Sequence, residues 1–238
     1  MKISQRLKLI ESMVINRYDH IWDCCCDHGL LGAKLLDNHR ALVVHFVDVV
    51  PDLMRSVGEK LERYYPLAQG EQPRWQVHCL DAALLPLASK DKSQLIIIAG
   101  VGGELLISLV NAILAAHPQH KLEFILCPVQ HTFEVRKALS QLNLGLIDEN
   151  LLEENSRFYE VLHVSTFSQQ QVSLVGNKMW DLTRSLDQRY LQKTLSHYQR
   201  IEAGLQCKPI NSQSDVSAKD VSRIIKSYQA LTTLRNKF

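Results

Sequence analysis

Residues 21–36 constrain the fold most, because a short apolar run passes there through an acidic turn into a helical pattern. The pattern predicts a buried strand, a tight turn over Asp23–Gly29 and then a helix. A second apolar strand follows and ends in Asp48, 19 residues after Gly29. This is the layout of a nucleotide-binding βαβ unit, in which the turn receives the ligand and the acid binds ribose hydroxyls.

The chemistry of the turn departs from the pattern of dinucleotide-binding proteins. G-x-G-x-x-G is absent, and Cys25 and Asp27 stand where its first two glycines would be. A pyrophosphate needs bare backbone and no anion nearby, so this turn disfavours such a ligand. An acidic turn instead suits a ligand with an amine and a sulfonium. The sequence therefore predicts S-adenosylmethionine as the cofactor.

Apolar runs alternate with helical patterns as far as residue 167, which is typical of a parallel sheet made of βαβ units. The expected strands are 20–25, 42–49, 75–80, 94–100, 122–128, 144–150 and 160–167. The expected helices are 29–38, 51–65, 103–116 and 132–143. No long helix separates the last two strands, which therefore should form an antiparallel hairpin. The predicted fold class is α/β, with a Rossmann-like class I methyltransferase sheet.

A different pattern begins after the polar residues 168–171. Apolar residues recur every three or four positions over 179–205 and again over 221–231, and a segment at 208–218 with Pro209 separates the two stretches. This predicts a C-terminal helical hairpin or short antiparallel coiled coil. We therefore expect two domains, a cofactor-binding domain at 1–168 and a helical coiled-coil domain at 172–238.

Charge is unevenly distributed between these two parts. Residues 176–238 contain 11 Lys and Arg against 5 Asp and Glu, which gives them +6, while the whole chain of 238 residues carries only +2. A basic tail on an acidic body indicates a polyanionic partner, but a solvated helical face explains the same charge equally well.

Composition excludes several classes of protein. The chain is 46% hydrophobic and 22% charged, and its longest apolar stretch, 95–103, is too short to cross a bilayer. No apolar signal core opens the sequence, so we expect a cytoplasmic protein without a membrane partner. The cysteines at 24, 25, 26, 79, 127 and 207 include no CxxC pair, and no HExxH occurs. We therefore predict no metal site and reduced thiols.

A second motif, LIIIAGVGGELL at 95–106, takes an apolar strand into a glycine-rich turn. In a doubly wound sheet this turn lies beside the ligand crevice, where glycines let a ligand approach the backbone. A plain strand-to-helix turn is the alternative. Asp81 follows the third expected strand. It could accept a hydrogen bond from the amine of an adenine ring, or it could cap a turn. With Asp23 and Asp48 it places acids at the ends of three successive strands.

Several motifs together resemble those of the bacterial tRNA (adenine(22)-N(1))-methyltransferases. These are SQRL at 4–7, D-x-x-x-DH at 23–28, IAGVGG at 98–103, CPVQHTFEVR at 127–136, LIDENLLEE at 146–154, FYEVL at 158–162 and LVG at 174–176. The resemblance covers nearly the whole chain, including the helical tail. It implies a Rossmann-like fold with a C-terminal coiled coil, and methyl transfer from S-adenosylmethionine to N1 of an adenine in tRNA.

Candidate site residues follow from the strand ends and from this resemblance. Cofactor contacts are expected from Arg6, Asp23, Cys25, Gly29, Asp48, Asp81, Ala82, Ala99 and Gly100. Catalytic roles are expected for Asp27, which would accept the N6 amine of the target adenine and offset its developing charge, and for His28 and Tyr159, which would position or stack on the base. Substrate contacts are expected from Gly102, Gly103, Pro128, His131 and Arg136, and tRNA phosphate contacts from Arg184, Arg189, Lys193, Arg200, Arg223 and Lys226.

Structural roles compete with these assignments. Asp27 also suits a helix N-cap, His28 and Tyr159 suit packing, and Arg6 suits an RNA phosphate or a surface ion pair. The family usually has a glycine where Cys25 stands and Q-P-N where residues 127–129 read CPV. One alternative is therefore a relative that binds S-adenosylmethionine or RNA without turnover, and another is a methyltransferase that acts on a different RNA base. A third is an NAD-dependent oxidoreductase, although the missing G-x-G-x-x-G counts against it. We expect a monomer or weak homodimer.

Overall fold

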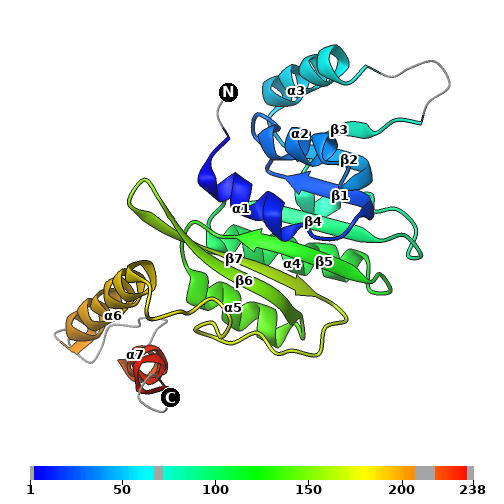
Figure 1. Ribbon diagram of the computed structural model, residues 1–238. Coiled ribbons are helices and arrows are strands. Elements are labelled where there is room, and N and C mark those ends of the chain that lie inside the picture. The colour runs from blue at the N-terminus through cyan, green and yellow to red at the C-terminus, as the bar shows by residue number, and fades with distance from the viewer. Residues whose placement is uncertain (1–2, 67–71, 207–217, 235–238) are drawn as a thin grey trace. The chain divides into compact units, whose positions relative to one another are not determined.

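The computed structural model describes residues 3–66, 72–206 and 218–234 (Figure 1). Its backbone divides into two compact units, Met1–Ser173 and Leu174–Phe238. The first unit contains every strand and the second contains the two C-terminal helices.

A seven-stranded sheet forms the centre of the first unit, in the order β3-β2-β1-β4-β5-β7-β6. Its strands are β1 Tyr18–Cys24, β2 Ala41–Asp48, β3 Trp75–Cys79, β4 Gln94–Ala99, β5 Leu122–Cys127, β6 Gly145–Glu154 and β7 Arg157–Ser165. The first five strands of this order are parallel, and β7 pairs antiparallel to both β5 and β6. This confirms the α/β class and the terminal hairpin. The strand order reverses between β1 and β4, which is where ligands bind in open α/β sheets.

Helices cover both faces of the sheet (Figure 1). The helices α1 Gln5–Met13, α2 Leu30–Asp37 and α3 Pro51–Tyr64 pack on one face, and α4 Gly103–Ala116 and α5 Thr132–Gln141 pack on the other. Alternate residues of β4 enter the two cores, with Ile96 in one and Ile97 in the other. Because both faces are buried, the strand is an unbroken apolar run after Gln94.

The first helix, α1, was missed by the sequence analysis, although a signal for it exists. Ser4 is its N-cap and accepts a hydrogen bond from the main-chain N–H of Leu7 at 3.2 Å. Ile10 and Met13 then follow at spacings of three, and both are buried against the sheet. This helix matters because it carries Arg6 to the crevice.

The hairpin of β6 and β7 is longer than the strands expected at 144–150 and 160–167. Asn155 and Ser156 form its two-residue turn, with φ of 51° and 61°. Two left-handed residues give the twist that a tight hairpin needs. Strand pairing therefore extends to the turn itself, where Glu154 pairs with Arg157. The main-chain N–H of Gln5 donates to Oε1 of Glu154, which joins the hairpin end to α1.

Three histidines form a hydrogen-bonded row across β1, β2 and β3. His20 Nδ1 lies 2.9 Å from His45 Nε2, and His45 Nδ1 lies 2.9 Å from His78 Nε2. Trp22 stacks on the ring of His45 with a centroid distance of 3.7 Å. Burial lowers the pKa of all three imidazoles, to about 3 for His45, which also faces its two neighbours. The row is therefore neutral at physiological pH.

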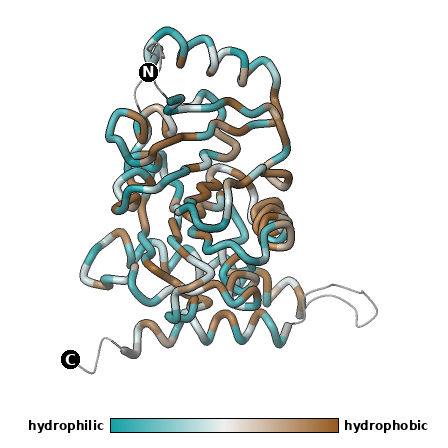
Figure 2. The backbone as a smooth tube through the Cα atoms, turned by 90° about the vertical axis from the view of Figure 1, so that its right-hand side faces the viewer, coloured by the Kyte–Doolittle hydropathy of each residue, from teal (hydrophilic) through white to brown (hydrophobic). Residues whose placement is uncertain are grey.

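The second unit, taken by itself, contains α6 Ser185–Gln206 and α7 Ala218–Leu234, which pack together. The rings of Tyr198 and Tyr228 stack with centroids 6.2 Å apart, and hydrophobic and hydrophilic residues alternate along α7 in Figure 2. Two helices are thus confirmed, while a coiled coil stays a prediction. Met179 and Leu182 lie before α6 rather than within it. The predicted break at 208–218 falls almost wholly outside the described residues.

Among the described residues, no helix is long and apolar enough to cross a membrane. The same residues contain no group of three or more His, Cys, Asp or Glu side chains placed to hold a metal ion. Within this part of the chain the cysteines at 24, 25, 26, 79 and 127 are free thiols.

Candidate active site

The turn between β1 and α2 has an unusual backbone. Cys25, Asp27 and Gly29 have φ of 57°, 51° and 71°, so three of five consecutive residues are left-handed. Glycine adopts this conformation freely, whereas a side chain makes it costly by about 1–2 kcal/mol. Cys25 therefore occupies a position whose conformation favours glycine. Its thiol is partly buried, and burial followed by the charge of Asp48 raises the pKa of Cys25 to about 11.

Asp23, at the end of β1, is buried with 4% of its surface exposed. Its Oδ2 accepts a hydrogen bond from the main-chain N–H of Gly32 at 2.9 Å, within the first turn of α2. The N-cap residue of α2 is Gly29, which has no side chain, so Asp23 satisfies this helix from the neighbouring strand. Burial, together with the nearby charge of Asp48, raises the pKa of Asp23 to about 7.

Asp27 does not cap α2, contrary to its alternative structural role. Its side chain is 71% exposed and lies 3.6 Å from the ring of His28, which is itself 44% exposed. Both side chains therefore stand at the mouth of the turn, free of the core and accessible to a substrate.

Asp48 and Asp81 end the two neighbouring strands. Asp48 accepts hydrogen bonds from the main-chain N–H groups of Asp27 and Val50, each at 3.2 Å. Asp81 caps the short 3-10 helix η1, Ala82–Leu84, by accepting from Ala83 N at 2.9 Å. With Asp23 they form the predicted row of acids along the carboxyl edge of the sheet. Ala82 is buried in the core beneath them.

Arg6 and Tyr159 meet at the other side of the turn. The Arg6 guanidinium lies over the Tyr159 ring, 5.1 Å from its centroid, and would lie 3.5 Å from a Cβ placed on Gly100. The φ of Gly100 is +85°, a left-handed conformation that favours glycine there. Arg6 occupies one face of the Tyr159 ring, so only the opposite face remains for a base.

A cavity of about 90 Å³ lies between Arg6, the cysteine turn and Ala99. The Nε of Arg6 is buried and has no hydrogen-bond partner in the structure. An unpaired buried donor of a guanidinium is costly, and a carboxylate is the group that satisfies it best. The cavity therefore fits the amino-acid end of a cofactor such as S-adenosylmethionine, with an acid nearby for its amine.

The glycine-rich turn after β4 faces the loop after β5. A Cβ on Gly103 would lie 2.7 Å from the Gln130 carbonyl oxygen, and one on Gly102 would lie 3.4 Å from the Gln130 side-chain nitrogen. Close packing of the two loops therefore requires glycine at 103, whereas the contact at Gly102 is an ordinary one with a flexible side chain. His131 is exposed and lies 3.8 Å from Glu104, whereas Pro128 is buried. Gln130, which the sequence analysis did not single out, is the exposed amide beside this turn.

Arg136 does not contact a substrate, which corrects its assignment. Its side chain is fully buried and forms ion pairs with Glu149 at 2.7 Å and Glu160 at 2.6 Å. It also donates to the carbonyl oxygen of Ser173 at 3.0 Å. These contacts join α5 to the β6–β7 hairpin, so the residue has a structural role.

The tail cations lie in the second unit and differ in their surroundings. Arg184 is largely engaged, since it donates to Asp187 at 2.6 Å and to the Met179 carbonyl at 2.8 Å. Four other cations on α6 and α7 are exposed: Arg189, Lys193, Arg223 and Lys226. Arg200 is also exposed and donates to the Ser196 carbonyl at 3.2 Å.

The strand order, the crevice at the switch point and the row of acids define a Rossmann-like methyltransferase fold. The chain belongs to the family described as "Methyltransferase domain", whose model matches residues 3–162. It is 28% identical over 166 residues to the tRNA (adenine(22)-N(1))-methyltransferase of Bacillus subtilis, a match that spans 68% of this chain and 64% of that protein.

Solved structures share the fold over nearly the whole chain. The B. subtilis m1A22 tRNA methyltransferase TrmK has a TM-score of 0.73 and 22% identity, covering 96% of this chain and 98% of its own. M. capricolum TrmK, solved with S-adenosyl-homocysteine, has a TM-score of 0.74 and 15% identity, covering 97% of this chain and 98% of its own.

Proposed function

We propose that this protein transfers a methyl group from S-adenosylmethionine to N1 of an adenine in tRNA. The observation that carries the proposal is the unpaired Nε of Arg6, buried beside a small cavity at the cofactor turn. An unpaired guanidinium donor next to acidic side chains matches the carboxylate and the amine at the amino-acid end of this cofactor. The similarity to the B. subtilis tRNA methyltransferase supports the choice of substrate.

Different residues of the chain would bind different parts of the cofactor. Arg6 would bind its carboxylate, while Ala99 and Gly100 admit its methionine part close to the backbone. Asp48 would accept hydrogen bonds from the ribose hydroxyls, and Asp81 with the main chain of Ala82 would bind the adenine ring. The bound cofactor supplies an electrophilic methyl group on a sulfonium.

Adenine N1 already has a lone pair, so the protein needs no strong base to create a nucleophile. Its tasks are to align N1, exclude water and stabilise the cationic product. Asp27 stands exposed at the mouth of the turn, where it would accept the N6 amine and offset the positive charge. His28 would position the base, and the free face of Tyr159 would stack on it.

The proposed partner is tRNA, and the proposed place of action is the cytoplasm. The exposed cations of α6 and α7 would bind phosphates with little sequence readout. We keep the domain boundary at 168–172, the coiled coil and a monomer or weak homodimer as predictions. The left-handed Cys25 keeps a second candidate open, a relative that binds S-adenosylmethionine or RNA without turnover.

The deciding experiment is methylation of tRNA by the purified protein with S-adenosylmethionine, followed by mass spectrometry of the nucleosides. We expect 1-methyladenosine, and a large loss of rate in Asp27→Asn with S-adenosylhomocysteine affinity retained. Binding of both ligands without any methylated nucleoside would support the non-catalytic candidate. A different methylated nucleoside would overturn the assignment of the base.

A further inference from the structure

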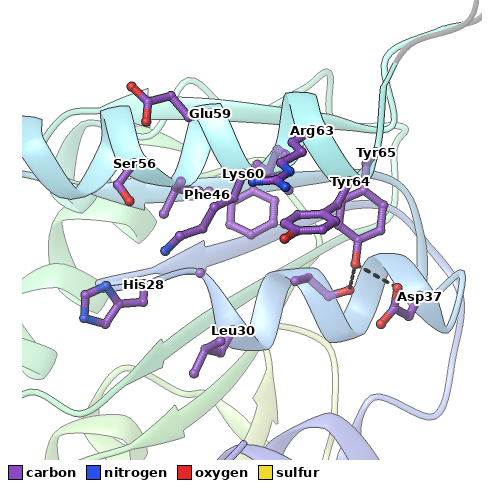
Figure 3. A pocket seen from close by; sticks show the side chains of 14 residues that line it. His28, Leu30, Asp37, Phe46, Ser56, Glu59, Lys60, Arg63, Tyr64 and Tyr65 are labelled. Atoms are coloured by element: carbon purple, nitrogen blue, oxygen red, sulfur yellow. Dashed lines mark hydrogen bonds between the residues drawn. The ribbon is translucent and has the colours of Figure 1, made fainter. Parts of the chain in front are cut away.

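A groove of about 860 Å³ lies between α2 and α3 and extends away from the cofactor turn (Figure 3). Phe46, Val57 and Ala33 contribute apolar surface to it, and the side chains of Lys60 and Tyr64 line it from α3. Its volume is within the range of small-ligand sites, which is roughly 300–1,000 Å³. The groove is therefore large enough to hold one nucleotide.

The cations of the groove lack acidic partners. Lys60 and Arg63 form no ion pair among the described residues, whereas Arg55 on the same helix pairs with Asp52 at 3.1 Å. Of the two acids that line the groove, Asp37 accepts a hydrogen bond from the Tyr65 hydroxyl at 2.8 Å. Glu59 points away from α2 in Figure 3, while Lys60 extends toward it. The groove therefore offers a phosphate two cations that form no ion pair within the described part of the chain, although Asp37 and Glu59 also line it.

An aromatic ring lies beside this charge. Tyr64 is 66% exposed, and the Arg63 guanidinium lies over its ring at 5.5 Å from the centroid. An exposed ring with neighbouring cations is the combination that binds single-stranded nucleic acid, through base stacking and phosphate contacts. A tyrosine left so exposed on a helix has no evident packing role.

The groove begins at the cofactor turn. His28 and Gly29 line its end, and His28 also lines the small cavity that contains Arg6. A nucleotide in the groove would therefore belong to the same strand as a base presented to the turn.

We infer that the groove between α2 and α3 binds a single-stranded nucleotide of the RNA substrate next to the target adenine, with its phosphate on Lys60 and Arg63 and its base on Tyr64. This inference rests on the proposed function, since it takes tRNA as the substrate. It places part of the RNA surface on the catalytic unit, in addition to the tail.

Three variants and a matched control test the inference. Lys60→Ala combined with Arg63→Ala should weaken tRNA binding about tenfold and lower its log–log salt dependence by roughly one to two units. Tyr64→Ala should weaken binding about tenfold with the salt dependence unchanged, because it removes stacking and no charge, and Tyr64→Phe should restore it. Arg55→Ala, on the same helix but outside the groove, should change little.

Binding is measured directly by gel shift, beside the methylation KM and kcat for tRNA and calorimetry with S-adenosylhomocysteine. We expect the KM to rise while the kcat and the S-adenosylhomocysteine affinity stay within about twofold, since Tyr64 and Lys60 lie outside the cofactor turn. Photo-crosslinking of 4-thiouridine-substituted tRNA should label the peptide that contains residues 51–64.

The outcomes separate this inference from the proposed function. If the wild-type protein methylates tRNA and the groove variants bind it as tightly as Arg55→Ala, the groove is not an RNA site and the function stands. If the protein binds tRNA but methylates nothing, the proposed function fails while the crosslink still decides the groove. A crosslink found only on other peptides, or tight binding of an acidic peptide that tRNA does not displace, overturns the inference.

Discussion

The main-chain N–H of Asp27 donates a hydrogen bond to Oδ2 of Asp48, 3.2 Å away, across the cofactor turn. The residue proposed to bind ribose thus also holds the turn that receives the methionine end. Loss of its carboxylate therefore affects both the ribose and the methionine part of the cofactor. Variants of Asp48 should therefore differ in cofactor affinity according to whether they keep the hydrogen bond to the turn.

Asp48→Ala should weaken S-adenosylhomocysteine binding by about 2–3 kcal/mol, the scale of charged hydrogen bonds. Asp48→Asn should cost less, because its amide oxygen still accepts from the turn. Calorimetry measures both, with Asp52→Ala as the control, since Asp52 is an exposed acid at the start of α3. Unchanged affinity in a folded Asp48→Ala protein would remove Asp48 from the cofactor site.

Cys25→Gly should bind S-adenosylhomocysteine at least as tightly as the parent protein. The change removes a side chain from a left-handed position at φ of 57° and from the wall of the cofactor cavity. Cys25→Ala is the control, because it keeps the Cβ and the strain but removes the thiol. If calorimetry shows that glycine and alanine both weaken binding, the thiol makes a useful contact and the steric explanation is wrong.

Stability without cofactor should fall as the pH rises from about 4 to about 7, because of Asp23. Its carboxyl has an ordinary pKa of 3.8, raised to about 7 in the folded protein by burial and by Asp48. Between these values the folded state holds a proton that the unfolded chain has lost, so the stabilisation present at low pH disappears, and above pH 7 the contribution is constant.

Asp23→Asn keeps an oxygen for the Gly32 N–H and removes this titration. Urea unfolding at a series of pH values should therefore show the parent losing roughly 2–4 kcal/mol relative to the variant between pH 4 and 7. Parallel stability curves for the two proteins would show that Asp23 is ionised throughout this range.

Arg136→Met should destabilise the protein by about 3–5 kcal/mol, because it leaves the carboxylates of Glu149 and Glu160 buried without their partner. Lys137→Ala, an exposed change at the next position, should stay within roughly 0.5 kcal/mol. Denaturant unfolding measures both. A small loss in Arg136→Met would mean that one of the two acids is protonated in the folded state.

Neutralising Arg189, Lys193 and Arg200 on α6 should reduce the log–log salt dependence of tRNA binding by about two units, since each phosphate contact contributes roughly 0.7–0.9. S-adenosylhomocysteine binding should not change. The control neutralises Lys90, Lys121 and Lys137, three exposed lysines of the first unit. If both triple variants lose the same amount, the tail acts only through net charge.

The sheet could be predicted from the sequence because each strand carries its own signal. Buried parallel strands such as β4 are short apolar runs, and the turns that end them carry Gly or Asp. The helix α1 was missed because it is short and precedes the first strand, so no alternation marks it. The hairpin end was missed because polar residues such as Glu153 form strand there.

The position of candidate site residues was predictable where they lie at a strand end, as for Asp23 and Asp48, whose cofactor roles stay predictions. A side chain's role was not predictable where it depends on partners far along the sequence. The resemblance motif at 127–136 suggested a substrate role for Arg136, and the sequence alone does not show that Glu149 and Glu160 lie beside it on other elements. Lys60 and Tyr64 read as an ordinary exposed helix face until α2 is placed opposite them.

The histidine row of β1, β2 and β3 has a consequence for the precision of the active site. In a neutral imidazole one nitrogen donates and the other accepts, so His45 can satisfy both His20 and His78 only if all donors run in one direction. Sliding any of these strands by one residue would turn a ring to the other face of the sheet. The hydrogen bonds of the row therefore help to fix the register of these three strands. Through that register, the interior of the sheet sets the spacing of the acids at 23, 48 and 81 at its edge.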